Sequence, residues 1–172
     1  MSSLTEFRRQ KDVFFKTDPQ SPLMPDQRTN FDSLRYFPEN PQLRITTKVE
    51  ESSDQQIVPM ITSTGAVKEY YKYGQFSFEV DGQTATLQVY QDADRTYFFL
   101  PFVDATAPEE TYGAGRYLDL EPEHGNTFVI DFNYAYNPYC AYNENWNCPI
   151  PPRENRLAVR IEAGEKTFKK DL

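Results

Sequence analysis

The sequence predicts a mainly β fold, an antiparallel β-sandwich or barrel-like single domain with an N-terminal α-helix packed on it. Three observations support this prediction: apolar and polar residues alternate from residue 41 onward, strand-like segments recur about every 10 residues, and no helical pattern separates them. The length of 172 residues is typical of one domain. We therefore expect one domain over residues 1–172, with a helix and a proline-rich irregular segment over 1–40 and a β-rich body over 41–172.

The first 40 residues predict a helix followed by an irregular crossing. The helix is expected over residues 3–17, where four apolar side chains fall on one side at helical spacing: Leu4, Phe7, Phe14 and Phe15. It ends before Pro19, which cannot continue a helix. From Asp18 to Pro41 the chain carries five prolines and little periodic apolar pattern, which predicts an ordered irregular segment or a short helical turn.

After Pro41 the apolar period changes from about 3.6 to 2, which is typical of half-buried strands. Two alternating runs, 76–80 and 85–89, flank the pair Asp81 and Gly82, which strongly favours a β-hairpin turn. Other strands are expected at residues 43–49, 57–62, 67–73, 96–100, 116–120, 127–132 and 157–161. Long loops are expected at residues 101–116 and 133–156.

Aromatic residues make up 15% of the chain, with 13 Phe and 12 Tyr, so rings are expected to supply much of the buried apolar area. No stretch approaches the roughly 20 apolar residues that cross a bilayer. The N-terminus also lacks the apolar segment of a secretory signal. We therefore expect a soluble, cytoplasmic protein.

The net charge of −8 is concentrated in the middle of the chain. Residues 1–16 and 153–172 each carry about +2, which leaves about −12 for the residues between them. Such a field repels phosphate groups, so neither nucleic-acid binding nor attachment to anionic membranes is expected. The acidity suits either solubility or the attraction of a cation or basic ligand.

The segment 101–156 is where a functional site is expected. Strand signals thin out there, and Tyr, Asn, Gly, Pro and acidic residues replace them. Between residues 104 and 152, eight carboxylates accompany a single arginine, Arg116. Two interpretations stay open: Arg116 clamps two loops together through carboxylates, or it holds the carboxylate or phosphate of a ligand.

Polar side chains at the end of the expected strand 127–132 point to the same region. If alternate residues of this strand face the core, Asp131 and Asn133 lie where the strand runs into a loop rich in Asn and Tyr. Residues at such positions either bind ligands or cap loops. The candidate ligand-binding residues are Asp104, Glu110, Tyr112, Arg116, Asp131, Asn133, Tyr136, Asn137 and Tyr142.

Three rings add an aromatic surface to the second loop: Tyr139, Tyr142 and Trp146. They suit stacking or cation–π contact with a sugar-like or cationic ligand. They suit locking the loop onto the core equally well, and the sequence does not decide between these uses.

Cys140 and Cys148 are the two cysteines of the chain, and His124 is its one histidine. A structural zinc site needs four Cys or His ligands, usually with closely spaced cysteines, so no metal site is expected. The two cysteines form either a disulfide or redox pair, or two reduced thiols.

The sequence carries no recognisable catalytic motif. It lacks a G-x-S-x-G elbow, and "YGAG" at 112–115 has neither the lysine nor the following helix of a phosphate loop. We expect a binding domain for a small polar molecule, with a pocket formed by loops 104–119 and 131–156. Two alternatives remain: a protein-interaction module that uses a free sheet edge, and a carboxylate- or metal-dependent hydrolase that uses Asp104, Glu110, Asp131 and Arg116.

The longest motifs resemble a known family. "DATAPEETYGAGRYLDL", "DFNYAYNPYCAYNENWNCPIPPRENRL" and "AGEK" are similar to the DUF1684 family of bacterial and archaeal proteins, as are "FRRQKDVFFKTDPQSPL" and "LRYFP" near the start. The family is one of unknown function, so the resemblance implies no activity, cofactor or ligand and leaves the oligomeric state open. The residues that match its pattern are Asp104, Glu110, Tyr112, Gly113, Gly115, Arg116, Tyr117, Asp131, Asn133, Tyr136, Asn137, Cys140, Tyr142, Cys148, Pro149 and Asn155.

Overall fold

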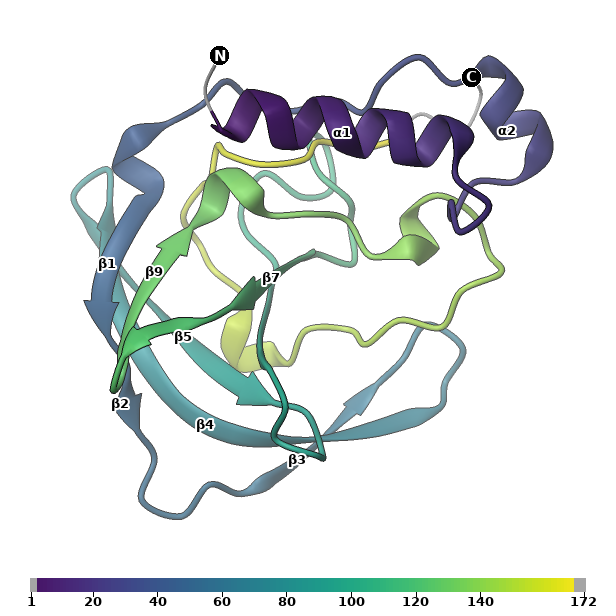
Figure 1. Cartoon of the computed structure of the whole chain (residues 1–172). Coiled ribbons are helices and arrows are strands. Elements are labelled where there is room, and N and C mark those ends of the chain that lie inside the picture. The colour runs from purple at the N-terminus through teal and green to yellow at the C-terminus, as the bar shows by residue number, and fades with distance from the viewer. Residues whose placement is uncertain (1–2, 169–172) are drawn as a thin grey trace.

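The computed structural model describes residues 3–168 and confirms a mainly β fold with an N-terminal helix. Figure 1 shows helix α1 (Ser3–Thr17) lying across one end of the β-strands, with the short helix α2 (Pro25–Asn30) following it. The strands of the described range are β1 (Arg44–Lys48), β2 (Glu50–Glu51), β3 (Ile57–Ile61), β4 (Val67–Val80), β5 (Gln83–Gln91), β6 (Phe98–Phe102), β7 (Arg116–Leu120), β8 (Pro122–His124) and β9 (Thr127–Asp131). Single 3₁₀ turns lie at Pro41–Leu43, Phe132–Tyr134, Tyr139–Ala141 and Arg153–Asn155.

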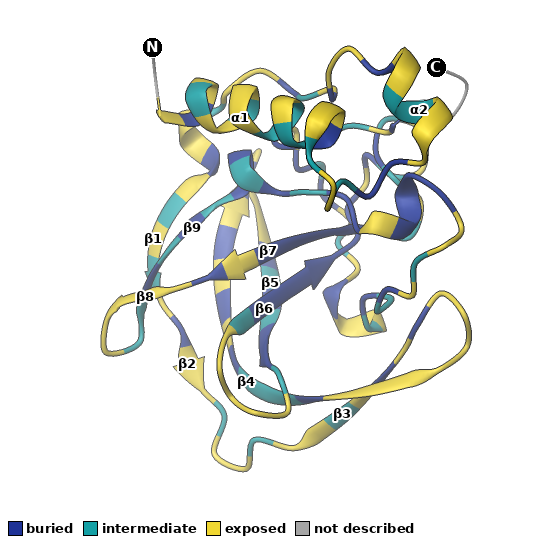
Figure 2. Cartoon of the chain, turned by 45° about the vertical axis from the view of Figure 1, so that its right-hand side comes forward, coloured by how far each residue is buried: buried dark blue, intermediate teal, exposed yellow. Residues whose placement is uncertain are grey.

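The strands form two antiparallel sheets, which gives a sandwich-like architecture. The smaller sheet has the order β1-β9-β8, and the larger has the order β2-β4-β5-β6-β7 with β3 also paired to β4. The main core contains residues of both sheets, among them the fully buried Leu87, Leu100, Phe128 and Ile130. Figure 2 shows the result: β6 and β7 are largely buried, whereas the β3 region is exposed.

The hairpin of β4 and β5 confirms the expected turn at Asp81 and Gly82. Both residues have positive φ angles, 50° and 80°, and Val80 pairs with Gln83 across the turn. Two consecutive positive φ angles define the turn whose twist matches that of antiparallel strands. Glycine adopts this conformation without steric cost, and aspartate tolerates it better than most residues.

The two strands expected at 67–73 and 76–80 are a single strand, β4. Its pairing with β5 shifts register between Lys72 and Gly74, which marks a β-bulge. The bulge lets β4 present buried rings on both faces of its sheet: Tyr70 packs in a cluster with Phe99, whereas Phe76 packs in the main core. The alternation is broken at the bulge, so one long strand resembles two in the sequence.

The expected strand at 157–161 is wrong, although Ile161 packs in the core as its apolar character suggests. Its backbone runs beside residues 103–105, with hydrogen bonds of 2.7 Å from the Leu157 N–H and 2.9 Å to the Val159 carbonyl. Further along, side chains replace the ladder, because the Ile161 N–H donates to Asp104 (2.7 Å) and its carbonyl accepts from Arg116 (2.9 Å). Polar side chains therefore satisfy backbone groups that a strand would satisfy by pairing.

Helix α1 packs onto the β body through only part of its expected apolar face. Leu4 and Phe15 are buried, but Phe7 is 41% exposed and Phe14 is half-buried. Phe7 and Phe14 both border a cavity that lies between the helix and the loop over 136–148. Over residues 3–168, no helix is long and apolar enough to cross a bilayer.

Candidate functional site

Arg116 and Asp104 form a buried clasp. The Arg116 side chain is 1% exposed, and its Nη2 pairs with the Asp104 carboxylate at 3.2 Å. The two Nη atoms also donate to the carbonyls of Ala163, Ile161 and Glu165. Burial lowers the pKa of Arg116, and the neighbouring Asp104 opposes this shift. Both Nη atoms are thus occupied by the chain itself, and the guanidinium fastens β7 to the C-terminal segment.

The other acids of the candidate set are engaged elsewhere. Glu110 pairs with Arg160 at 2.7 Å on the surface. Asp131 accepts from the Asn133 N–H at 3.0 Å and from its side-chain amide at 2.8 Å, as a loop cap does. Asn133 in turn exchanges hydrogen bonds with the backbone of Asn40. These residues tie loops together and do not share one cavity.

Three further candidates, Asn137, Tyr142 and Tyr112, make contacts that hold the loop over 133–156 to the rest of the protein. Asn137 donates to the Lys166 carbonyl at 3.0 Å, and the Tyr142 hydroxyl donates to the Glu165 carboxylate at 2.7 Å. The Tyr112 hydroxyl lies 3.6 Å from the sulfur of Cys140. Among the nine candidate ligand-binding residues and the two cysteines, Tyr136 and Cys148 line a cavity between α1 and the loop over 136–148, and so do the ring residues Tyr139 and Trp146.

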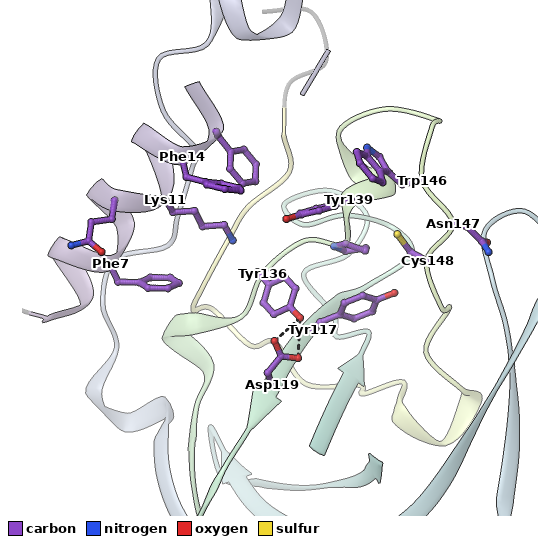
Figure 3. A pocket seen from close by; sticks show the side chains of 13 residues that line it. Phe7, Lys11, Phe14, Tyr117, Asp119, Tyr136, Tyr139, Trp146, Asn147 and Cys148 are labelled. Atoms are coloured by element: carbon purple, nitrogen blue, oxygen red, sulfur yellow. Dashed lines mark hydrogen bonds between the residues drawn. The ribbon is translucent and has the colours of Figure 1, made fainter. Parts of the chain in front are cut away.

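The cavity has a volume of about 770 Å³ and lies between α1, the end of β7 and the loop over 136–148. Figure 3 shows Phe7, Lys11 and Phe14 extending from the helix on one side, with Tyr139, Trp146 and Cys148 on the other. The lining residues are Phe7, Gln10, Lys11, Phe14, Phe15, Tyr117, Asp119, Tyr136, Pro138, Tyr139, Trp146, Asn147 and Cys148. The wall is therefore mainly aromatic, with a few polar groups.

The contribution of α1 is what the sequence interpretation missed. Phe7, Lys11 and Phe14 are spaced by four and three residues, which places them along one helix face. A lysine between two phenylalanines on that face is the signal that could have revealed a partly open, functional side of the helix. Its ammonium group pairs with the buried carboxylate of Glu165, a residue that the sequence did not single out.

Asp119 is the unbalanced charge of the cavity. Both of its carboxylate oxygens accept from the Tyr136 hydroxyl at 3.0 Å (Figure 3). Among the described residues, no basic side chain lies within ion-pair distance of it. The Asp119 side chain is open to solvent through the cavity. The surrounding walls still desolvate it in part, which raises its pKa, and the Tyr136 hydrogen bond and Lys11 oppose this shift. Since Lys11 and Glu165 neutralise each other, about one negative charge remains.

The aromatic rings of the wall are inclined to one another, so that both ring faces and ring edges line the cavity. Tyr139 and Trp146 are 5.2 Å apart between centroids and inclined by 65°, and Tyr117 and Tyr136 are 5.8 Å apart at 90°. The Lys11 ammonium lies 5.1 Å from the Tyr136 centroid, which is a cation–π distance. Such a wall accommodates an apolar or aromatic body and favours positive charge. Over residues 3–168, no group of three or more His, Cys, Asp or Glu side chains is placed to hold a metal ion.

The family model described as "Protein of unknown function (DUF1684)" matches residues 29–166. The chain belongs to this family. A solved structure of an uncharacterized protein from Haloarcula marismortui, determined by solution NMR, has 37% identity and a TM-score of 0.73, and the match covers 95% of this chain and 92% of that one. No match is found among curated proteins. The DUF1684 match contains the loop wall of the cavity and begins at residue 29, after α1, which forms the opposite wall.

Proposed function

We propose that this protein binds a small organic cation, with an apolar or aromatic body and an ammonium group, in the cavity between α1 and the loop over 136–148. The observation that carries the proposal is the Asp119 carboxylate, which faces an aromatic cavity without a basic partner among the described residues. The ligand class follows from the cavity wall. The sequence predicts a small polar ligand, but the wall is mainly aromatic and suits a ligand with an apolar body.

Three features support a cationic ligand. A positive group at Asp119 would gain a charge-assisted hydrogen bond and contacts with the electron-rich faces of the nearby rings. The Tyr136 hydroxyl holds the carboxylate in place before binding, which lowers the entropic cost of association. The net charge of −8 also favours the approach of cations from solution.

The size of the cavity supports a ligand with a sizeable body. A volume of about 770 Å³ lies within the range of roughly 300 to 1,000 Å³ usual for small-molecule sites. Phe14, Tyr139 and Trp146 supply apolar surface away from the carboxylate. An amine that carries an aromatic ring would therefore use both parts of the wall.

Replacing Asp119 with asparagine is expected to weaken amine binding about tenfold, because a charge-assisted hydrogen bond is lost while side-chain size is kept. The measurement is a titration of the protein with phenethylamine, by calorimetry or ligand-observed NMR, with phenethyl alcohol as the neutral probe. The unaltered protein should prefer the amine, and D119N should bind both probes alike. Glu110→Gln, which removes a carboxylate distant from the cavity lining, is the matched control. Equal binding of both probes by the unaltered protein would contradict the proposal.

Binding of a permanently charged probe, benzyltrimethylammonium, is expected to weaken as the pH falls through the pKa of Asp119. Partial desolvation by the cavity walls raises this pKa above the ordinary value of about 3.9, so the loss begins at a higher pH than for a freely exposed aspartate. The probe does not titrate, so the change reports the protein. In D119N the affinity should stay flat over the same range, and a flat profile in the unaltered protein would count against the role of Asp119.

The raised pKa of Asp119 also predicts how the stability of the fold changes with pH. The direction is opposite to that of an aspartate whose pKa is lowered by folding. A carboxyl whose pKa is higher in the folded state stabilises the fold at low pH and loses that contribution as the pH rises through the folded pKa. At neutral pH Asp119 is therefore expected to lower stability, and D119N should unfold at an equal or higher denaturant concentration than the unaltered protein. A clear loss of stability in D119N would show that Asp119 serves the fold.

The alternative of a carboxylate-dependent hydrolase receives less support. It needs two carboxyl groups that face one cavity, and Asp104, Glu110 and Asp131 are each engaged by other groups of the chain. Asp104 is buried, and none of the three lines the principal cavity.

The alternative of a protein-interaction module through a sheet edge also receives limited support. Strand β3 does expose Ile57 and Ile61, and Val67 beside it on β4 is 57% exposed. However, Pro59 in the middle of β3 has no N–H to offer a partner strand, and the Ile61 carbonyl already accepts from the Ile150 N–H at 2.8 Å. The outer edge of β3 is therefore partly blocked against strand addition.

A further inference from the structure

We propose that Cys140 and Cys148 form a redox-active dithiol at the cavity wall, which reduces a small hydroperoxide while the two thiols are oxidised to a disulfide. The inference is independent of the proposed cation site, because it uses neither Asp119 nor the ligand. It assigns an activity to the two cysteines, which the sequence left as either a disulfide or redox pair, or two reduced thiols.

The two thiols are free and lie together. Both pack in one cluster with Met60, Tyr70 and Tyr117, and each thiol lies close enough to shift the pKa of the other. Cys148 lines the cavity, and each cysteine keeps 9% of its surface exposed. A reagent as small as hydrogen peroxide can therefore reach the pair from the cavity.

Hydrogen-bond donors surround the pair, as a thiolate requires. The Tyr112 hydroxyl lies 3.6 Å from the Cys140 sulfur, and the Ser63 side chain beside the pair lowers the pKa of Cys140. The backbone N–H groups of Tyr139 and Cys140 interact with the sulfur of Cys148. Ser63 is itself held in place, because its hydroxyl accepts from the Cys148 N–H at 3.1 Å. Oriented donors of this kind stabilise negative charge on sulfur.

The two thiols differ in acidity: Cys140 loses its proton easily, and Cys148 keeps its own. The hydrogen bond from Cys148 lowers the pKa of Cys140 to about 6, and burial opposes this shift. The pKa of Cys148 is raised, first by its hydrogen bond to Cys140 and then by burial, because a second ionisation would place two negative charges together. The other titratable groups that face the pair are the phenols of Tyr70, Tyr112 and Tyr117, whose pKa values burial raises, so they stay protonated at neutral pH.

The reaction has two steps that balance. In the first, the Cys140 thiolate attacks one oxygen of the hydroperoxide, the O–O bond breaks, and the departing oxygen takes a proton from solvent to leave as an alcohol or water. In the second, the Cys148 sulfur attacks the sulfur of the Cys140 sulfenic acid, the S–O bond breaks, and the hydroxyl leaves as water with the Cys148 proton. One hydroperoxide gains two electrons, and two thiols lose them.

The test treats the full chain with one equivalent of hydrogen peroxide at neutral pH. We expect both thiols to be lost, the intact mass to fall by two hydrogens, and peptide mapping to find the Cys140–Cys148 bond. In Cys148→Ser the reaction should stop at a Cys140 sulfenic acid that dimedone traps, and Cys140→Ser should react only slowly. Glu110→Gln, which alters a surface carboxylate paired with Arg160, is the control and should react as the unaltered protein does. Thiols that survive in the folded protein but react after denaturation would overturn the proposal.

A second readout does not depend on any cysteine variant folding. Alkylation of the unaltered protein by iodoacetamide should occur first at Cys140, with a rate midpoint near pH 6 instead of the usual value of about 8.5. Tyr112→Phe removes one donor and should move this midpoint upward. Tyr73→Phe, whose hydroxyl donates to Asn126 and whose ring packs against the main core, should leave it unchanged. A midpoint above 8 in the unaltered protein would overturn the assignment of the thiolate.

Discussion

Replacing Arg116 with alanine is expected to lower the free energy of unfolding by about 3 to 5 kcal/mol, because it leaves the buried Asp104 carboxylate without its partner. The change also frees the backbone carbonyls of Ala163, Ile161 and Glu165 in an environment that water does not reach. The C-terminal segment has no sheet ladder of its own there, so this guanidinium is a principal attachment. Equilibrium denaturation in urea measures the loss.

The matched control for Arg116 is Arg160→Ala. Arg160 also pairs with an acid of the same region, Glu110, but both side chains are more than 40% exposed, and surface pairs contribute little. Its stability should stay close to that of the unaltered protein. In a double-mutant cycle, Asp104→Ala and Arg116→Ala should cost less together than the sum of the two single changes, because each leaves the other group uncompensated. A loss below about 1 kcal/mol for Arg116→Ala would contradict the clasp and restore the ligand-anchor interpretation.

Asn155→Ala is expected to cost about 3 to 5 kcal/mol, because the Asn155 side chain satisfies three backbone groups in a fully buried position. Its amide donates to the carbonyls of Gln88 (2.9 Å) and Pro101 (2.7 Å), and its oxygen accepts from the Gln88 N–H at 2.8 Å. These bonds join the Arg153–Asn155 turn to β5 and β6. Denaturant unfolding with amide hydrogen exchange at Gln88 measures both the global and the local loss.

The control for Asn155 is Asn145→Ala, which removes the same side chain from an exposed position in the same loop. Its unfolding midpoint should not change measurably. Asn155→Asp is informative as well, since it keeps the acceptor for Gln88 N–H but loses both donors and places a charge beside two carbonyls. If Asn155→Asp proved as stable as the unaltered protein, the account of this residue as a three-way hydrogen-bonding bridge would fail.

Much of the fold follows from local patterns. The helix over residues 3–17, the turn at Asp81 and Gly82, and strand β7 at 116–120 lie where their sequences indicate. The helix and the turn depend on interactions between near neighbours in the chain, namely helical spacing and two consecutive positive φ angles, whereas β7 is largely buried and shows no alternation. The DUF1684 assignment also follows from the motifs, and the family match over residues 29–166 confirms it.

The predictions failed where distant groups replace local ones. The segment 157–161 has the composition of a strand, but Asp104 and Arg116 take the place of its ladder. The bulge in β4 likewise arises from pairing with β5, and it divides one strand into two apparent ones. A pattern within a segment does not reveal whether its backbone groups will be met by another strand or by side chains.

The sequence by itself determined that this chain is a mainly β protein with an N-terminal helix, and it located the polar and aromatic stretch around 104–156 in which Tyr136 and Cys148 lie. Only the tertiary structure decided which of those residues are free to act. The Nη atoms of Arg116 bind Asp104 and backbone carbonyls, whereas Asp119 faces an aromatic cavity whose second wall comes from α1. The physical reason is that a polar side chain is available to a ligand only if no other part of the chain satisfies it. The partners that do so lie far off in the sequence, 49 residues for Arg116 and Glu165 and 50 for Arg160 and Glu110.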